Sequence, residues 1–175
     1  ADRAAEAQVA LAAAGVHDEA LRHARDEVGE GVGREPRAVQ PEVVRARHAR
    51  ECGRLLVVDE GRAAFVDTGA APAAPRLLAA LDELGIAREQ VDYLFLTHVH
   101  LDHAGGAGQL IEALPNARAV LHPRGAPHMI DPTKLIAGSI QVYGEELFNQ
   151  LYGKLVPVPA ERIVVTEDGT RIRLG

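Results

Sequence analysis

The segment from Thr97 to Gly106 reads T-H-V-H-L-D-H-A-G-G and places three histidines and an aspartate within six residues. An apolar run at 91–96, broken by a single aspartate, leads directly into it and predicts a buried β-strand. Side chains two positions apart point the same way on an extended backbone, so His98, His100 and Asp102 are expected to share one side. Any fold for this chain must therefore gather these polar groups where a buried strand ends.

The same residues predict a metal site rather than an exposed histidine cluster. His103 is expected to join the other three where the chain turns after Asp102. Imidazole nitrogens and carboxylate oxygens are ligands of Zn²⁺, and iron or manganese accept the same donors. Gly105 and Gly106 allow the backbone to pass close to such a centre, and 107–114 is predicted to be a helix leading away from it.

Two motifs in this sequence resemble those of a known family. T-H-x-H-x-D-H-x-G-G, at 97–106, resembles the signature of the metallo-β-lactamase-fold hydrolase superfamily, and Asp67-Thr68-Gly69 resembles that superfamily's first motif. The resemblance covers roughly 55–175. It implies an α/β fold of the metallo-β-lactamase type, an αββα sandwich, of which this chain would supply the N-terminal half. The residues before it, which do not resemble the family, are expected to add an extra N-terminal helical segment.

The resemblance also implies a site with two metal ions, zinc in the full family site, with iron or manganese as alternatives. It places His98 and His100 on the first ion and Asp102 and His103 on the second. Asp102 would also orient the attacking hydroxide, and Asp67 would support the metal-binding loop from behind it by accepting hydrogen bonds. The implied reaction is attack of metal-bound hydroxide on an ester, thioester, lactone or amide of a small anionic substrate. A glyoxalase-II-like thioesterase is one candidate.

The family site needs three further ligands, and this sequence does not show them in matching motifs. After His103 the only histidines are His122 and His128. His122 follows a predicted strand at 117–121 and is expected at the edge of the site or in solvent, with a role as a fifth ligand left open. Two ligands for each ion are too few for tight binding, so the isolated chain is expected to bind metal weakly and to hydrolyse poorly.

Two other functions stay open. The chain could be an inactive or interaction-only half-domain that self-associates through an exposed sheet face. It could also be a retroviral-type aspartic protease, because two apolar residues followed by Asp-Thr-Gly-Ala at Asp67 resemble the catalytic turn of that class. Such a protease needs two aspartates that share a proton across a dimer, and the histidine motif would then have no explanation.

Composition narrows the class of partner. The net charge of −6 argues against a nucleic-acid-binding surface. A single cysteine, Cys52, excludes an internal disulfide and suits a reducing compartment. No apolar run reaches the length of a membrane span. We therefore expect a cytoplasmic protein that acts on a small molecule and binds neither nucleic acid nor membrane.

The chain is expected to divide near residue 54. Residues 1–54 are predicted to be an Ala-rich helical segment followed by an irregular basic linker, and 55–175 to be the partial hydrolase domain. Strands are predicted at 55–58, 63–66, 91–96 and 117–121, helices at 76–84, 107–114, 134–140 and 144–151, and a closing hairpin at 163–165 and 172–174. Tyr143, Phe148 and Tyr152 lie in the segment that contains the last two predicted helices. They could roof a substrate pocket or simply pack on the sheet.

Overall fold

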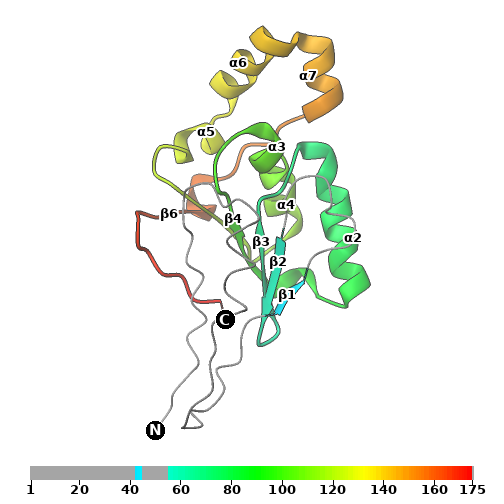
Figure 1. Ribbon diagram of the computed structural model, residues 1–175, viewed down its shortest axis with the longest axis vertical. Coiled ribbons are helices and arrows are strands. Elements are labelled where there is room, and N and C mark those ends of the chain that lie inside the picture. Colours follow the sequence, from blue (N-terminus) through cyan, green and yellow to red (C-terminus); the bar gives the residue numbers. More distant parts are fainter. Residues whose placement is uncertain (1–41, 45–54, 175) are drawn as a thin grey trace, which may run out of the picture.

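The computed structural model describes residues 42–44 and 55–174, and they form a six-stranded mixed sheet with helices on the connections (Figure 1). The strands lie in the sheet in chain order: β1 (Glu42–Val44), β2 (Leu55–Asp59), β3 (Arg62–Val66), β4 (Val91–Phe95), β5 (Arg118–Leu121) and β6 (Ile163–Val165). β1, β2 and β3 pair antiparallel, whereas β3 to β6 pair parallel. The predicted α/β class is confirmed. The predicted N-terminal helices lie outside the described residues.

Each parallel pairing is made possible by a helical crossover, because parallel strands cannot be joined by a tight turn. The crossovers are η1 (Ala71–Ala73) with α2 (Ala74–Leu84), then α3 (Leu101–Ala104) with α4 (Ala107–Ala113), and then α5 (Ala126–Ile130), α6 (Thr133–Tyr143) and α7 (Glu145–Tyr152). Two further 3₁₀ turns, η2 (Arg88–Gln90) and η3 (Ala160–Arg162), precede β4 and β6. As a result, the carboxyl ends of β3, β4 and β5 meet at one edge of the sheet.

Alternation along the strands divides the apolar residues between the two faces of the sheet. Phe65 and Leu94 belong to the main core, where they are buried together with Leu81 of α2 and Leu110 of α4. On the other face lies a smaller buried cluster: Val57, Ala64, Phe95, Val120 and Leu174. The main core therefore fixes α2 and α4, the helices that follow the two family motifs, against the sheet.

The structure corrects four predictions. A strand, β1, lies within the segment predicted to be an irregular linker, and it pairs with β2. Two short helices, α3 and α5, lie in segments for which no helix was predicted. The closing hairpin is absent, because β6 pairs parallel with β5 and the residues at 170–174 form no strand. The turn before them is present, with Gly169 at φ 78°.

α6 and α7 form a helical hairpin, here called the α6–α7 arm (133–152), which stands above α3 and away from the sheet (Figure 1). Gly144, with φ 78°, separates the two helices. None of the residues of α6 is buried, and α7 buries only Phe148. Across the described ranges, no helix has both the length and the apolar character needed to cross a bilayer.

Candidate active site

Asp67 is held in a sharp turn immediately after β3. Its φ is 57°, a left-handed conformation that aspartate tolerates better than most residues. Its backbone N–H donates to the carbonyl oxygen of Phe95 at 2.8 Å, so the turn is attached to the end of β4. The residue is 5% exposed. The turn thus buries the carboxylate of Asp67 beside the first residues of the histidine motif.

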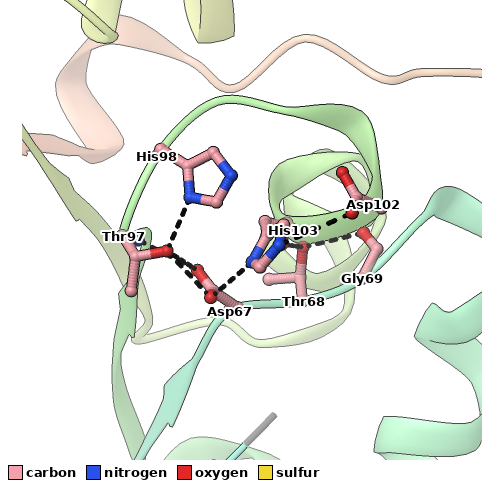
Figure 2. A network of polar contacts seen from close by, with 7 residues as sticks. All are labelled: Asp67, Thr68, Gly69, Thr97, His98, Asp102 and His103. Atoms are coloured by element: carbon pink, nitrogen blue, oxygen red, sulfur yellow. Dashed lines mark hydrogen bonds and ion pairs between the residues drawn. The ribbon is translucent and has the colours of Figure 1, made fainter. Parts of the chain in front are cut away.

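Both oxygens of the buried Asp67 carboxylate accept hydrogen bonds (Figure 2). The backbone N–H of Thr97 donates to Oδ1 at 2.9 Å, and the Thr97 hydroxyl lies 3.0 Å from Oδ1 and 2.9 Å from Oδ2. Nδ1 of His103 lies 2.8 Å from Oδ2. Such a set of donors satisfies the hydrogen-bonding capacity of a buried carboxylate.

These contacts assign the tautomers of two histidines. An ionised carboxylate only accepts, so Nδ1 of His103 carries the hydrogen and its Nε2 keeps a free lone pair. The single hydrogen of the Thr97 hydroxyl is directed to Asp67. Nδ1 of His98, 3.0 Å from that hydroxyl, must then be the donor. Both histidines consequently present Nε2 as an acceptor, which is the form that binds a metal ion.

The three histidines of the motif form one cluster. The ring centroids of His98 and His100 are 4.7 Å apart, and those of His98 and His103 are 4.0 Å apart. Oδ2 of Asp102 lies 3.5 Å from Nε2 of His103. Partial burial, and then the charges of His103 and His100, lower the pKa of His98. The lowered pKa favours the neutral imidazole that metal binding requires.

The backbone of the motif differs from the expected extended segment. β4 ends at Phe95, and α3 begins at Leu101 after His100 as its N-cap residue. Asp102 and His103 therefore lie in the first turn of a short helix, and a shared side of one strand does not account for the cluster. The cluster forms instead because α3 folds back toward the end of β4 and brings His103 to His98.

A second set of contacts holds α3 against the Asp67 turn. The carbonyl oxygen of His103 accepts from the backbone N–H groups of Thr68 and Gly69, at 2.7 and 2.9 Å, and from the Thr68 hydroxyl at 3.0 Å. The N–H of Gly106 donates to the carbonyl of Gly69 at 2.8 Å. A Cβ at Gly106 would lie 3.2 Å from the Thr68 carbonyl oxygen, so the close approach favours glycine.

The donor set fits a metal centre by chemical type. His98, His100, Asp102 and His103 would be the ligands from this chain. In the described ranges, however, no three His, Cys, Asp or Glu side chains are arranged as a ready cage around one ion. That these four residues form part of a larger ligand shell stays a prediction.

His122 is not brought to the histidine cluster by any contact described in the structure. It is exposed at the end of β5, and its Nδ1 accepts the backbone N–H of Arg124 at 3.2 Å. The loop that carries it nevertheless contacts the motif, because a Cβ at Gly125 would lie 2.8 Å from Cγ1 of Val99. His122 thus lies near the rim, and its part in the site stays a prediction. His128 lies in α5, where no helix was predicted.

The three aromatic residues of the α6–α7 arm contact one another. Ring centroids are 5.7 Å apart both for Tyr143 and Tyr152 and for Phe148 and Tyr152. Phe148 is buried. Tyr143 is exposed and Tyr152 is half-buried. The two tyrosines are therefore the members of this group that a substrate could reach.

The roles of Thr97 and Thr68 in positioning the site were not predicted from the sequence. Thr97 joins Asp67 to His98, and Thr68 holds the carbonyl of His103. Their positions in the two motifs could have indicated these roles, because Thr97 directly precedes the first histidine and Thr68 directly follows Asp67.

Comparison with known proteins decides the family. The profile of the Metallo-beta-lactamase superfamily matches residues 55–174. The chain belongs to the metallo-beta-lactamase superfamily. Among curated proteins, it is 34% identical over 96 residues to a hydroxyacylglutathione hydrolase of Salmonella paratyphi A, an alignment that covers 53% of this chain and 34% of that protein. It is 33% identical, over the same length and coverage, to the hydroxyacylglutathione hydrolase of Salmonella typhi.

Solved structures of metallo-beta-lactamases share the fold. A Cronobacter sakazakii metallo-beta-lactamase with a HARLDQ motif is 24% identical, with a TM-score of 0.50 over 70% of this chain and 42% of its own. MIM-1 from Novosphingobium pentaromativorans is 26% identical, with a TM-score of 0.50 over 70% of this chain and 41% of its own. The chain thus spans about a third of the length of the curated relatives and about two fifths of these structures.

Proposed function

We propose that this chain carries the first half of the active site of a metal-dependent hydrolase that cleaves an acyl bond in a small anionic substrate. The family and the relatives named hydroxyacylglutathione hydrolase support a hydrolase and favour a thioester among the four bond types predicted. Ester, lactone and amide bonds are the alternatives within the same proposed reaction. The proposed cofactor is zinc, with iron or manganese as alternatives that the same donors accept.

The observation that carries the proposal is the hydrogen-bond network centred on Asp67. Its carboxylate orients His103 directly and His98 through the hydroxyl of Thr97. A ligand whose other nitrogen is held in this way has a fixed tautomer and ring orientation, and it is a stronger base toward a metal. A histidine cluster with only a packing role would not need a buried carboxylate that fixes the tautomers of two histidines and leaves the Nε2 lone pair of each available.

The roles of the individual residues follow from their positions. When bound, the metal ions would lower the pKa of a water and polarise the scissile carbonyl. His98 and His100 would hold one ion, and His103 and Asp102 the other. Asp102 is exposed and has only one close neighbour, His103, in the described contacts. We assign it the additional role of holding the attacking water through one of its protons.

The aspartic-protease alternative has no support in the structure. Catalysis by that class requires a carboxylate that reaches its partner aspartate and the substrate. The carboxylate of Asp67 is buried, and both of its oxygens accept hydrogen bonds from Thr97 and His103 of the same chain. The superfamily match also explains the histidine motif, which the protease alternative left without a role.

The test of the proposal is zinc binding by the purified chain, measured by equilibrium dialysis and elemental analysis, together with hydrolysis of a hydroxyacyl thioester of glutathione. We expect weak zinc binding that is lost in the His98→Ala/His100→Ala double variant, and thioester hydrolysis that a chelator abolishes. His128→Ala, which removes a histidine from α5 away from the cluster, is the matched control. Equal zinc binding in the double variant and in the wild type would contradict the assignment of the site. Zinc binding without turnover would favour the interaction-only half-domain.

A further inference from the structure

The segment that follows β5, here called the rim loop (122–125), begins beside the histidine motif. β4 and β5 pair parallel, with Phe95 opposite Val120. The pairing extends one step beyond the end of β4, because the N–H of Leu96 donates to the carbonyl of Val120 at 2.9 Å. Neighbouring strands of a sheet lie roughly 4.8 Å apart. The rim loop and the histidine motif therefore leave the same edge of the sheet from adjacent strands.

The rim loop also packs directly against the motif. A Cβ at Gly125 would lie 2.8 Å from Cγ1 of Val99, which stands between the first two histidines of the motif. The N–H of Gly125 donates to the carbonyl of His122 at 2.9 Å and closes a turn. The carbonyl of Gly125 accepts the N–H of His128 at 3.0 Å, so the turn leads straight into α5. These contacts fix the rim loop relative to the proposed metal ligands.

His122 has the opposite tautomer to the histidines of the cluster. Its Nδ1 accepts the backbone N–H of Arg124 at 3.2 Å, so the single ring hydrogen lies on Nε2. His98 and His103 carry theirs on Nδ1, where they contact Thr97 and Asp67. A metal ion at Nε2 of His122 would require the hydrogen to move to Nδ1 and the bond with Arg124 to break. His122 is therefore arranged to donate at Nε2 rather than to bind a metal ion.

Arg124 brings a positive charge to the same loop. Its side chain is exposed, and no carboxylate pairs with it in the part of the chain that the structure describes. Arg162 differs, because its guanidinium donates to the carbonyls of Ala117 and Leu114 at 2.8 and 2.7 Å and so has a structural role. A guanidinium presents its N–H groups in a plane that matches carboxylate and phosphate oxygens. Arg124 and His122 thus offer an oxyanion one charged and one neutral donor.

We propose that His122 and Arg124 bind an oxyanion of the substrate, a carboxylate or a phosphate group, at the rim of the active site and away from the bond that is cleaved. This inference rests on the proposed hydrolase function and adds to it the residues that select an anionic substrate. Nε2 of His122 donates to one oxygen of the anion, and the guanidinium of Arg124 donates to the same group. Because the rim loop is packed against the motif, an anion held there keeps the remainder of the substrate beside the histidine cluster.

The first test is nuclear magnetic resonance of the isotope-labelled full chain at about pH 8, above the usual titration range of imidazole. A chelator is present, so that no anion binds through a metal ion. Ring nitrogen shifts distinguish the two tautomers, and we expect the hydrogen on Nε2 in His122 and on Nδ1 in His98 and His103. Acetate and inorganic phosphate are then titrated separately. We expect saturable shifts of the His122 ring, and the probe that binds more tightly identifies the anion as a carboxylate or a phosphate.

The second test uses matched variants, with thermal unfolding as the check of folding. Arg124→Gln and Arg118→Gln remove the same charge on either side of β5, since Arg118 is exposed at the start of that strand. We expect Arg124→Gln to raise the Kd of the preferred probe about twofold to fivefold, the range of an exposed ion pair, and Arg118→Gln to leave it unchanged. His122→Ala should raise this Kd about twofold to tenfold, the range of one net hydrogen bond, and should bind zinc as the wild type does. His128→Ala should leave both properties unchanged.

Failure of this inference and failure of the proposed function give different results. Saturable anion binding that His122→Ala and Arg124→Gln weaken supports the inference even if no thioester is hydrolysed, an outcome in which only the proposed function fails. Three results overturn the inference and leave the hydrolase function in place. They are a hydrogen on Nδ1 of His122, equal effects of Arg124→Gln and Arg118→Gln on the Kd, and loss of zinc binding in His122→Ala.

Discussion

Two helical glycines allow a sharp test of how the segment that follows the α6–α7 arm is attached to α4. Gly108 in α4 and Gly138 in α6 would both gain helix propensity on substitution by alanine, about 0.5–1 kcal/mol. Their surroundings are opposite. A Cβ at Gly108 would lie 2.0 Å from the carbonyl oxygen of Val156, whereas a Cβ at Gly138 would have nothing within 4 Å. The same chemical change should therefore have effects of opposite sign at the two sites.

The cost at Gly108 follows from the clash. Ordinary contact begins at 3.4 Å, so the backbone at Val156 must retreat by about 1.4 Å. Overpacking of this kind costs roughly 1–3 kcal/mol. The displaced segment also holds the hydrogen bonds of Lys154 with Gln109 and of Val158 with Met129, each worth about 0.5–1.5 kcal/mol net. After the gain in propensity, we expect Gly108→Ala to lose roughly 1–3 kcal/mol of unfolding free energy.

Urea unfolding followed by far-ultraviolet circular dichroism measures both variants under the same conditions. Gly138→Ala should be as stable as the wild type or up to about 1 kcal/mol more stable, and Gly108→Ala should be less stable than either. If Gly108→Ala matched Gly138→Ala, the segment at 154–158 would not lie against α4 as described.

Two further predictions concern the site. Asp67→Asn replaces an acceptor-only carboxylate in contact with His103, so we expect zinc affinity to fall about 10- to 100-fold in a dialysis measurement; an unchanged affinity would show that Asp67 does not orient the ligands. A side-chain hydrogen bond with Tyr143, and then burial, raise the pKa of Tyr152 to about 12. Ultraviolet titration at 295 nm should therefore show one of the three tyrosines ionising near pH 12, and in Tyr143→Phe this residue should titrate near pH 10. Because its pKa is raised on folding, Tyr152 contributes stability that is present below pH 10 and is lost as pH rises toward about 12.

Local patterns were enough to predict most of the regular elements. The apolar runs at 55–58 and 91–96 became β2 and β4 with ends shifted by one residue, and 76–84 lies within α2, which ends before Gly85 in the left-handed conformation. The short helices α3 and α5 were missed because five residues or fewer cannot show a helical period. The prediction of a closing hairpin was wrong because two neighbouring apolar runs suggested that they pair with each other. Instead, β6 pairs with β5, from which it is separated in the chain by the α6–α7 arm.

The candidate site was predictable to the extent that it is contained in one motif. His98, His100, Asp102 and His103 lie within six residues, and the structure does group them. The role of Thr97 was not predictable, since its partner Asp67 is 30 positions away and the contact exists only after β3 and β4 pair. The spacing of the motif also suggested an extended backbone, but the structure has the helix α3 there. The prediction failed because residue spacing alone does not show where a strand ends.

The double attachment of His103 has a consequence for folding. Its side chain contacts Asp67 and its carbonyl contacts Thr68, across sequence separations of 36 and 35 residues. Contacts of this range form only after the intervening loop has closed, which makes them late events on the folding pathway. The arrangement of the proposed metal ligands would then be absent from partly folded chains. Metal affinity would increase only as β3 and β4 pair during folding. A metal present during refolding would stabilise the completed core and leave early helices unaffected.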